Sequence, residues 1–199
     1  MPSDMDDLAH RLEQRCILRG DFTLNSGKQS KYFYDGKRAL LAADLKVDIA
    51  AAMLDRAADT PYDIIGGIAI GSLLISEPMS VLSSLRDGRR IDTFYVRDER
   101  KTWGTGESTY QAIRADDTEV LQPGTRVLLV DDVITTGNSL RQALNVIEDR
   151  GASVAAISVI VDRMDPDADW LRDGYEFLPL FEVDESGSLH VARNRATVN

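Results

Sequence analysis

The tightest constraint on the fold is a short stretch in which a strand, a loop and a helix are predicted in direct succession. Residues 126–130 are mostly apolar, which predicts a short, buried parallel strand. Two adjacent carboxylates, Asp131 and Asp132, come directly after it. Apolar residues recur at helical spacing from Leu140, and Gly151 stands where a helix C-cap is expected. This succession predicts a strand–helix unit of a parallel sheet.

Residues 135–139, between that strand and that helix, have the composition of an anion-binding loop. They offer three hydroxyl groups, one amide side chain and successive backbone N–H groups at a helix N-terminus, where the helix dipole favours negative charge. Gly137 lets the backbone approach a ligand closely. Ligands of open parallel sheets bind at the carboxyl ends of the strands, where this loop lies.

An ordinary strand–helix turn with two acids is the alternative interpretation. Paired carboxylates beside an anion site are a poor arrangement unless a ligand bridges them. The hydroxyl groups of a ribose, with or without Mg²⁺, would provide that bridge. The sequence therefore favours a ligand that carries both a phosphate and a polyol.

Composition narrows the class of protein. The chain has 199 residues, of which 43% are hydrophobic, and this predicts a single domain over 1–199. A net charge of −10 argues against a nucleic-acid partner, so an anionic substrate needs local cations, which cluster at 28–38 and 97–101. No stretch has transmembrane length or a signal-peptide pattern, which predicts no membrane partner. The single cysteine, Cys16, excludes an intrachain disulfide and fits a reducing cytoplasm.

Predicted helices and strands alternate along the chain, which is typical of an α/β fold with a central parallel sheet flanked by helices. The expected helices cover about 3–18, 41–53, 72–85 (interrupted near Pro78) and the stretch from 140. The expected strands cover part of 20–34, then 63–67, 91–97, 110–114, 126–130, 153–161, 176–183 and 189–192. Cys16 falls on an apolar stripe of the first helix and is expected in the core.

A second glycine-containing loop, residues 66–72, follows the strand at 63–67. It lacks the lysine of a P-loop, which excludes a nucleoside triphosphatase of that type. Its place between a strand and a helix suits a second anion. The alternative is that its glycines serve only the packing of helix on strand.

The strand, the acid pair and the Val-Ile-Thr-Thr-Gly loop resemble the motif by which type I phosphoribosyltransferases bind phosphoribosyl pyrophosphate (PRPP). The resemblance implies that Asp131 and Asp132 hold the ribose 2′- and 3′-hydroxyls and meet a Mg²⁺ cofactor indirectly, through ribose or water. It implies a 5′-phosphate site made by Thr135, Thr136, Gly137, Asn138 and Ser139. It also implies pyrophosphate contacts at Gly67 and Gly71. Asn138 stands where glycine is common, and Asn tolerates a left-handed conformation.

Residues 95–106 resemble the mobile catalytic loop of orotate phosphoribosyltransferases. Four positions match in register: Arg97, Glu99, Lys101 and Gly104. Asp98 stands in place of a lysine and Trp103 in place of a histidine, so two pyrophosphate contacts are lost, and Arg100 compensates for part of the charge. The resemblance makes Arg97 and Lys101 catalytic, together with Asp131 and Asp132. It also implies a homodimer in which the loop at 97–106 reaches the neighbouring active site, whereas the alternative is a solvated charged loop.

Residues 22–35 resemble the N-terminal hood of the same enzymes, and Val161-Asp162-Arg163 resembles their Asp-Arg pair. The resemblance, which spans roughly 8–165, divides the chain into a core at about 41–165 and a hood formed by about 1–40 and the tail. The residues implied to bind orotate are Phe33, Tyr34, Arg163, Thr135 and Lys28. Asn25 replaces the family's orotate-contacting lysine, and Lys28 lies close by in sequence. The alternative for Arg163 is a surface ion pair with Asp162 or Asp165.

The resemblance implies transfer of the phosphoribosyl group from PRPP to orotate, with Mg²⁺, giving orotidine 5′-monophosphate and pyrophosphate. Two alternatives stay open. One is a phosphoribosyltransferase for another base, because Asn25, Asp98 and Trp103 depart from the pattern. The other is a non-catalytic regulator that senses PRPP or nucleotides.

Overall fold

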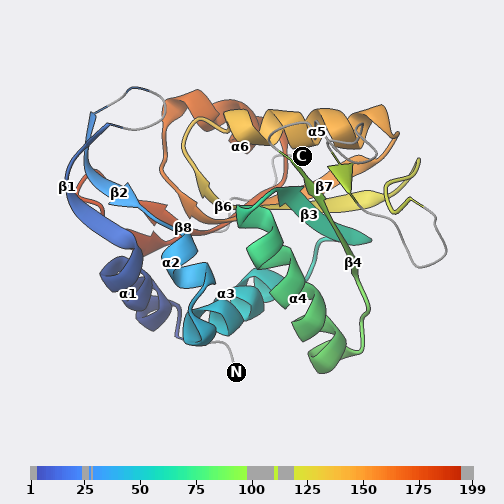
Figure 1. The fold of residues 1–199 in the computed structure, drawn as a ribbon, viewed down its shortest axis with the longest axis horizontal. Helices are drawn as coiled ribbons and strands as arrows, with labels where there is room; N and C mark the ends of the chain where they lie inside the picture. The colour runs from blue at the N-terminus through green and yellow to red at the C-terminus, as the bar shows by residue number, and fades with distance from the viewer. Residues whose placement is uncertain (1–3, 24–26, 28, 98–109, 112–118, 194–199) are drawn as a thin grey trace, which may run out of the picture.

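The computed structural model (Figure 1) describes residues 4–23, 27, 29–97, 110–111 and 119–193. The helices are α1 (Met5–Cys16), α2 (Lys37–Leu40), α3 (Ala43–Arg56), α4 (Gly71–Asp87), α5 (Asn138–Asp149) and α6 (Asp169–Gly174), with a short 3₁₀ turn η1 (Pro166–Ala168). The strands are β1 (Ile17–Thr23), β2 (Gln29–Tyr34), β3 (Ile64–Ile68), β4 (Asp92–Val96), β5 (Tyr110–Gln111), β6 (Arg126–Ile134), β7 (Ser153–Asp162), β8 (Phe177–Val183) and β9 (Leu189–Val191).

Seven strands form one sheet in the order β5-β4-β3-β6-β7-β8-β9. The inner strands β4, β3, β6, β7 and β8 pair in parallel, whereas β5 and β9 close the two edges in antiparallel fashion. The predicted α/β class with a central, mostly parallel sheet is confirmed. β1 and β2 form a separate antiparallel hairpin, which replaces the expected polar loop and short strand.

Helices cover both faces of the large sheet (Figure 1). α5 and α6 lie on one face, and α1 to α4 lie on the other. Alternate residues of β6 serve the two faces: Leu128 and Val130 join the core under α3 and α4, and Val127 and Leu129 join the core under α5. A strand buried on both faces is therefore apolar throughout, which is why the sequence shows a run instead of an alternation.

Helix α1 packs its apolar stripe into the first of these cores. Leu8, Leu12 and Cys16 are fully buried, and Met5 packs partly against them. The core position predicted for Cys16 is confirmed, and burial raises the pKa of its thiol to about 11. Among the described helices, none is long and apolar enough to cross a membrane.

Two predicted element boundaries were wrong. β6 does not end at Val130, because Asp131, Val133 and Ile134 continue the ladder with β7. The acid pair therefore stands inside the end of a strand and not in a loop. The predicted interruption at Pro78 is also absent, since α4 is continuous from Gly71 to Asp87. Ile75 and Met79 are buried on either side of Pro78, and their packing outweighs the single backbone hydrogen bond that a proline removes.

Candidate functional site

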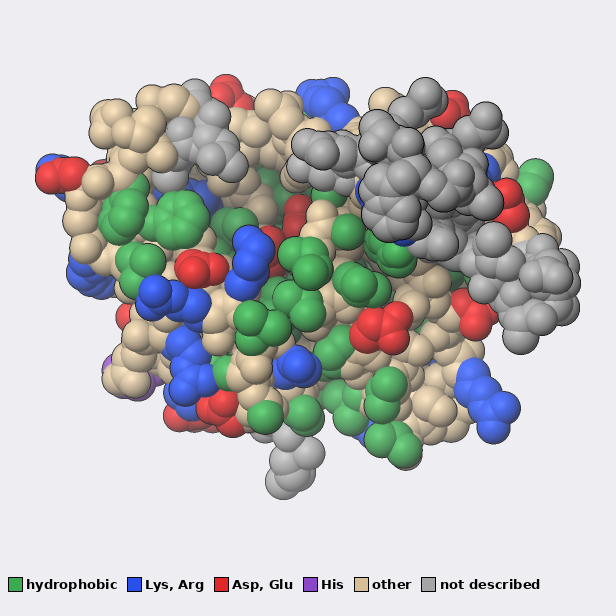
Figure 2. Space-filling model, viewed as in Figure 1, with side chains coloured by type: hydrophobic (Ala, Val, Ile, Leu, Met, Phe, Trp, Pro, Cys, Tyr) green, Lys and Arg blue, Asp and Glu red, His purple; other side chains and the backbone are tan. Residues whose placement is uncertain are grey.

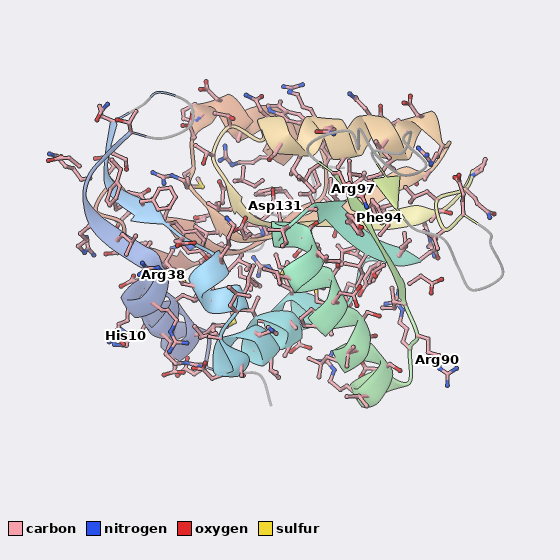
Figure 3. The ribbon with its side chains drawn as sticks, viewed as in Figure 1. His10, Arg38, Arg90, Phe94, Arg97 and Asp131 are labelled. Atoms are coloured by element: carbon pink, nitrogen blue, oxygen red, sulfur yellow. The ribbon has the colours of Figure 1, made fainter. Side chains whose placement is uncertain are left out.

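The acid pair lies at the carboxyl end of β6, near the middle of the molecule and beside the first residues of α4 (Figure 3). Asp131 is 7% exposed, and Asp132 is half-buried. The amide of Asp132 donates to Asp131 Oδ1 over 2.9 Å, and the amide of Val133 donates to Asp132 Oδ1 over 3.0 Å. These two bonds fix the rotamers of both carboxyl groups.

The electrostatics of the pair disfavour two negative charges. Burial raises the pKa of Asp131 well above its usual range, and the neighbouring charge of Asp132 raises it further. Burial also raises the pKa of Asp132, while the ammonium group of Lys37 acts in the opposite direction on both acids. A ligand that donates hydroxyl protons, or brings a cation, would relieve this repulsion.

At the start of each of two helices, a glycine lies against the carboxyl groups of the acid pair. A Cβ on Gly36, directly before α2, would collide with Asp132 Oδ2. A Cβ on Gly71, the first residue of α4, would lie 3.2 Å from Asp132 Oδ1 and 3.4 Å from Asp131 Oδ1. The structure thus brings Gly71 to the acid pair, as a shared site requires.

Gly67 has a packing role of its own. It lies inside β3, which runs on to Ile68, so the expected loop is shorter than residues 66–72. A Cβ on Gly67 would collide with the Val130 carbonyl oxygen and lie 2.8 Å from the Ser72 Cβ. The packing interpretation therefore accounts for this glycine, and its contact with pyrophosphate stays a prediction.

The loop at 135–139 leads into α5 through a left-handed residue. Gly137 has φ 73° and caps the helix without a side-chain hydrogen bond. A Cβ there would collide with Leu171 of α6, so glycine is required by conformation and by packing as well as by any ligand. Asn138 is already helical, so the left-handed conformation considered for it is not used.

The remaining loop residues frame this helix start. Thr135 and Thr136 are half-buried, and Asn138 and Ser139 are exposed. The Trp170 indole donates to the Thr136 carbonyl over 3.3 Å, which ties the loop to α6.

Arg97 follows β4 directly. Its guanidinium donates to the Tyr95 hydroxyl over 3.1 Å, and its carbonyl accepts a bond of 2.7 Å from Gln142 of α5. The segment expected to be the catalytic loop thus leaves the sheet from a point attached to α5. Several residues assigned from the sequence lie outside the described ones: Asn25, Lys28, Asp98, Glu99, Arg100, Lys101, Trp103 and Gly104.

Phe33 and Tyr34 lie on opposite faces of β2. Phe33 is 39% exposed, and its ring centroid lies 5.8 Å from that of Phe22. Tyr34 is buried, and burial raises its pKa well above the usual range, with the nearby Asp132 carboxyl adding to the effect. Because adjacent strand residues point in opposite directions, the two rings do not share one wall.

Arg163 is anchored beside the loop at 135–139. Its amide donates to the Ile134 carbonyl over 3.0 Å, which places it next to Thr135. Its side chain turns to the hairpin, donating to Ser30 Oγ over 3.2 Å with its guanidinium carbon 4.4 Å from the Tyr32 ring centroid. It also lines a cavity of about 790 Å³ between the hairpin and the tail strands. The alternative of an ion pair with Asp162 is wrong, because Arg172 pairs with that carboxylate. The alternative of an ion pair with Asp165 stays untested.

Sequence reasoning missed two cations near the site. The sequence placed Lys37 only in the basic cluster at 28–38. Its position beside the acid pair depends on how α2 packs near the end of β6. Arg172 lies in the tail, which carried no motif. In the described part of the chain, no group of three or more His, Cys, Asp or Glu side chains could hold a metal ion. The acid pair instead fits a Mg²⁺ ion that takes its other ligands from substrate and water.

Comparison with known proteins identifies the class. The Phosphoribosyl transferase domain family matches residues 39–185. The chain belongs to the phosphoribosyltransferase family.

Several similar proteins of this family are named orotate phosphoribosyltransferases. The orotate phosphoribosyltransferase of Thermococcus gammatolerans is 35% identical over 178 residues, covering 87% of this chain and 86% of the relative. That of Streptomyces coelicolor is 30% identical and covers 91% and 96%. A crystal structure of Mycobacterium tuberculosis orotate phosphoribosyltransferase with Fe(III) dicitrate superposes with a TM-score of 0.73 at 27% identity, covering 93% and 99%. A crystal structure of the same enzyme in complex with PRPP gives a TM-score of 0.68 at 27% identity, covering 89% and 94%.

Proposed function

We propose that this protein is an orotate phosphoribosyltransferase, which converts orotate and PRPP to orotidine 5′-monophosphate and pyrophosphate. The observation that carries the proposal is the acid pair at the end of β6, followed directly by the uncapped start of α5. Orotate phosphoribosyltransferases that are 30% and 35% identical over most of the chain support the choice of base.

The reaction is a displacement at the ribose C1. The bond from C1 to the pyrophosphate oxygen breaks, and a bond from C1 to a ring nitrogen of orotate forms. Positive charge develops on the ribose and negative charge on the departing pyrophosphate. Asp131 and Asp132 bind the ribose hydroxyls and face the developing positive charge, while Arg97 and Lys101 stabilise the leaving group. The N–H groups of residues 135–139 hold the 5′-phosphate.

In this proposal, cations near the β1–β2 hairpin select the base. Arg163 would bind the orotate carboxylate, with Thr135 beside it and Phe33 as the apolar neighbour. Arg163 is the best supported of these, because its backbone is bonded to the strand that carries the acid pair. Lys28 is a further proposed contact.

Mg²⁺ would be held by substrate oxygens and by Asp131 and Asp132 through ribose or water. When bound, it would neutralise charge on the pyrophosphate. The acid pair supports this assignment, because its raised pKa values mark a site that a cation would stabilise.

A homodimer in which the loop at 97–106 serves the neighbouring site completes the proposal. Exposed apolar side chains gather over α2, α3 and α4, on the face turned to the viewer in Figure 2. They include Leu41, Val47, Val81 and Leu85, with exposures of 54–80%. Such a surface is suited to a partner, and sedimentation of the purified protein measures its mass in solution.

The test is the fall in orotate absorbance when purified protein is mixed with PRPP, Mg²⁺ and orotate. Turnover that requires all three supports the proposal. Uracil, adenine, guanine and hypoxanthine serve as competing bases in parallel reactions. Turnover of one of these bases in place of orotate would refute the assignment, as would PRPP binding without any transfer.

A further inference from the structure

The turn at 163–165, which joins β7 to η1 and carries Arg163, is built around a buried ion pair. Asp162 ends β7 and is fully buried, and Arg172 of α6 is 8% exposed. The guanidinium grips the carboxylate with two bonds, Nε to Oδ2 at 2.8 Å and Nη2 to Oδ1 at 2.6 Å. A paired fork of this kind fixes direction as well as distance.

The same two side chains hold the backbone on both sides of the turn. Asp162 Oδ1 also accepts the amide of Met164 over 2.9 Å. Arg172 Nη1 donates to the Asp165 carbonyl over 2.9 Å and to Asp169 Oδ1 over 2.6 Å. One guanidinium is therefore hydrogen-bonded to the end of β7, to the turn and to the start of α6.

The turn needs such support. Met164 has φ 54°, and among the described residues it is the non-glycine residue with a left-handed backbone. This conformation is uncommon for a methionine and persists where neighbouring contacts impose it. Met164 follows Arg163 directly, and the Arg163 side chain reaches Ser30 and Tyr32 of the hairpin.

We propose that Asp162 and Arg172 are positioning residues for the base: they fix the turn that aims Arg163 at the carboxylate of orotate. The inference rests on the proposed function. Neither residue touches the substrate. Both act by preorganising Arg163, whose own side chain has several rotatable bonds and, among the described residues, one hydrogen bond and one ring contact.

The test variant is Asp162→Asn combined with Arg172→Gln. Removing both charges avoids an unpaired buried ion, which would itself destabilise the fold. We expect the KM for orotate to rise roughly tenfold or more, since small misplacements of a binding group have effects of this size. The KM for PRPP is expected to stay within about twofold, because the acid pair and the loop at 135–139 are unchanged.

The matched control is Asp63→Asn combined with Arg126→Gln. This pair has the same two-pronged geometry, with bonds of 3.0 and 2.7 Å. It lies at the N-terminal ends of β3 and β6, whereas the acid pair lies at the carboxyl end of β6. Both KM values should stay within about twofold in the control. Thermal unfolding of each variant shows whether it is folded at the assay temperature.

Three results would overturn the inference: an unchanged KM for orotate, a parallel rise in both KM values, or the same rise in the control. If the double variant does not fold, Arg172→Lys decides by the same criteria, because lysine keeps the charge but loses the fork. Wild-type protein that does not turn over orotate would refute the proposed function, and with it this inference, before any variant is compared.

Discussion

At the scale of single residues, the buried carboxyl of Asp131 is expected to serve function and to lower the stability of the folded protein at neutral pH. Its carboxyl is buried at the end of an apolar strand, and its pKa in the folded protein is raised above that in the unfolded chain. A raised pKa means that the folded state holds the proton more tightly. The stabilising contribution of this group is therefore complete below the unfolded pKa, about 3.9, and is lost as the pH rises through the folded pKa.

Asp131→Asn is expected to stabilise the protein without ligand at neutral pH and to abolish catalysis. Asparagine keeps an acceptor for the Asp132 amide but cannot ionise. We expect Tm to rise by roughly 2–4 °C at pH 7.5, the shift that about 1 kcal/mol gives in a domain of this size. The gain should shrink towards pH 4, where the wild-type carboxyl is protonated. We expect kcat/KM to fall by roughly a hundredfold or more.

Thermal unfolding between pH 4 and pH 8 (a range of about four units around the expected titration) measures this dependence. Asp59→Asn, an exposed substitution of the same chemistry, is the control and should change Tm by less than about 1 °C. A gain in Tm for Asp131→Asn that is constant with pH, or larger in acid, would contradict the argument.

At the scale of elements, the start of α5 is shaped by its packing against α6. Gly137 and Gly124 both have left-handed backbones, with φ 73° and φ 88°. A Cβ on Gly124 would meet no atom within 4 Å, whereas one on Gly137 would collide with Leu171. The two glycines thus differ mainly in packing.

Alanine at Gly137 is expected to destabilise the protein more than alanine at Gly124. Each substitution incurs roughly 1–2 kcal/mol for the left-handed conformation. The collision with Leu171 adds roughly 1–3 kcal/mol at Gly137 alone. Because relief of the collision moves the loop, Gly137→Ala should also raise the KM for PRPP. Denaturant unfolding and steady-state kinetics measure the two effects, and equal losses of stability in both variants would rule out the packing argument.

The elements most visible in the sequence are those whose pattern is local. The apolar spacing from Leu140 predicts α5, and the run at 126–130 predicts β6, because each follows from the period of its own backbone. The extension of β6 through Asp131 depends on pairing with β7, which is remote in sequence. The continuity of α4 through Pro78 depends likewise on its packing against the sheet. The local sequence pattern carries no signal for either of these contacts.

At the scale of the whole molecule, the site joins segments from most of the chain. The acid pair of β6 meets Gly36 before α2 and Gly71 of α4, and Lys37 acts on both carboxylates. The sequence predicts the acid pair and its loop as one unit, because that motif is contiguous. Lys37 and Arg172 escaped prediction, because their positions arise only when distant segments pack together. A site shared in this way exists only in the folded protein.

Mg²⁺ and PRPP together are therefore expected to stabilise the molecule as a whole. A ligand that binds only the folded state at a concentration 100 times its Kd adds about 2.7 kcal/mol to the free energy of unfolding. In a domain of this size the Tm should rise by roughly 5–10 °C. Ribose 5-phosphate, which offers the 5′-phosphate and the hydroxyls without pyrophosphate, should give a smaller rise. Thermal unfolding with each ligand measures the series.

The order of these shifts tests the division of the site into phosphate, ribose and pyrophosphate parts. If the proposed assignment holds, inorganic phosphate would bind only at the loop at 135–139 and should produce the smallest shift. Chelation of Mg²⁺ should remove most of the effect of PRPP, because the raised pKa values of Asp131 and Asp132 mark a pair that a nearby cation would stabilise. An equal shift with phosphate and with PRPP would mean that a general anion site, and not the acid pair, accounts for binding.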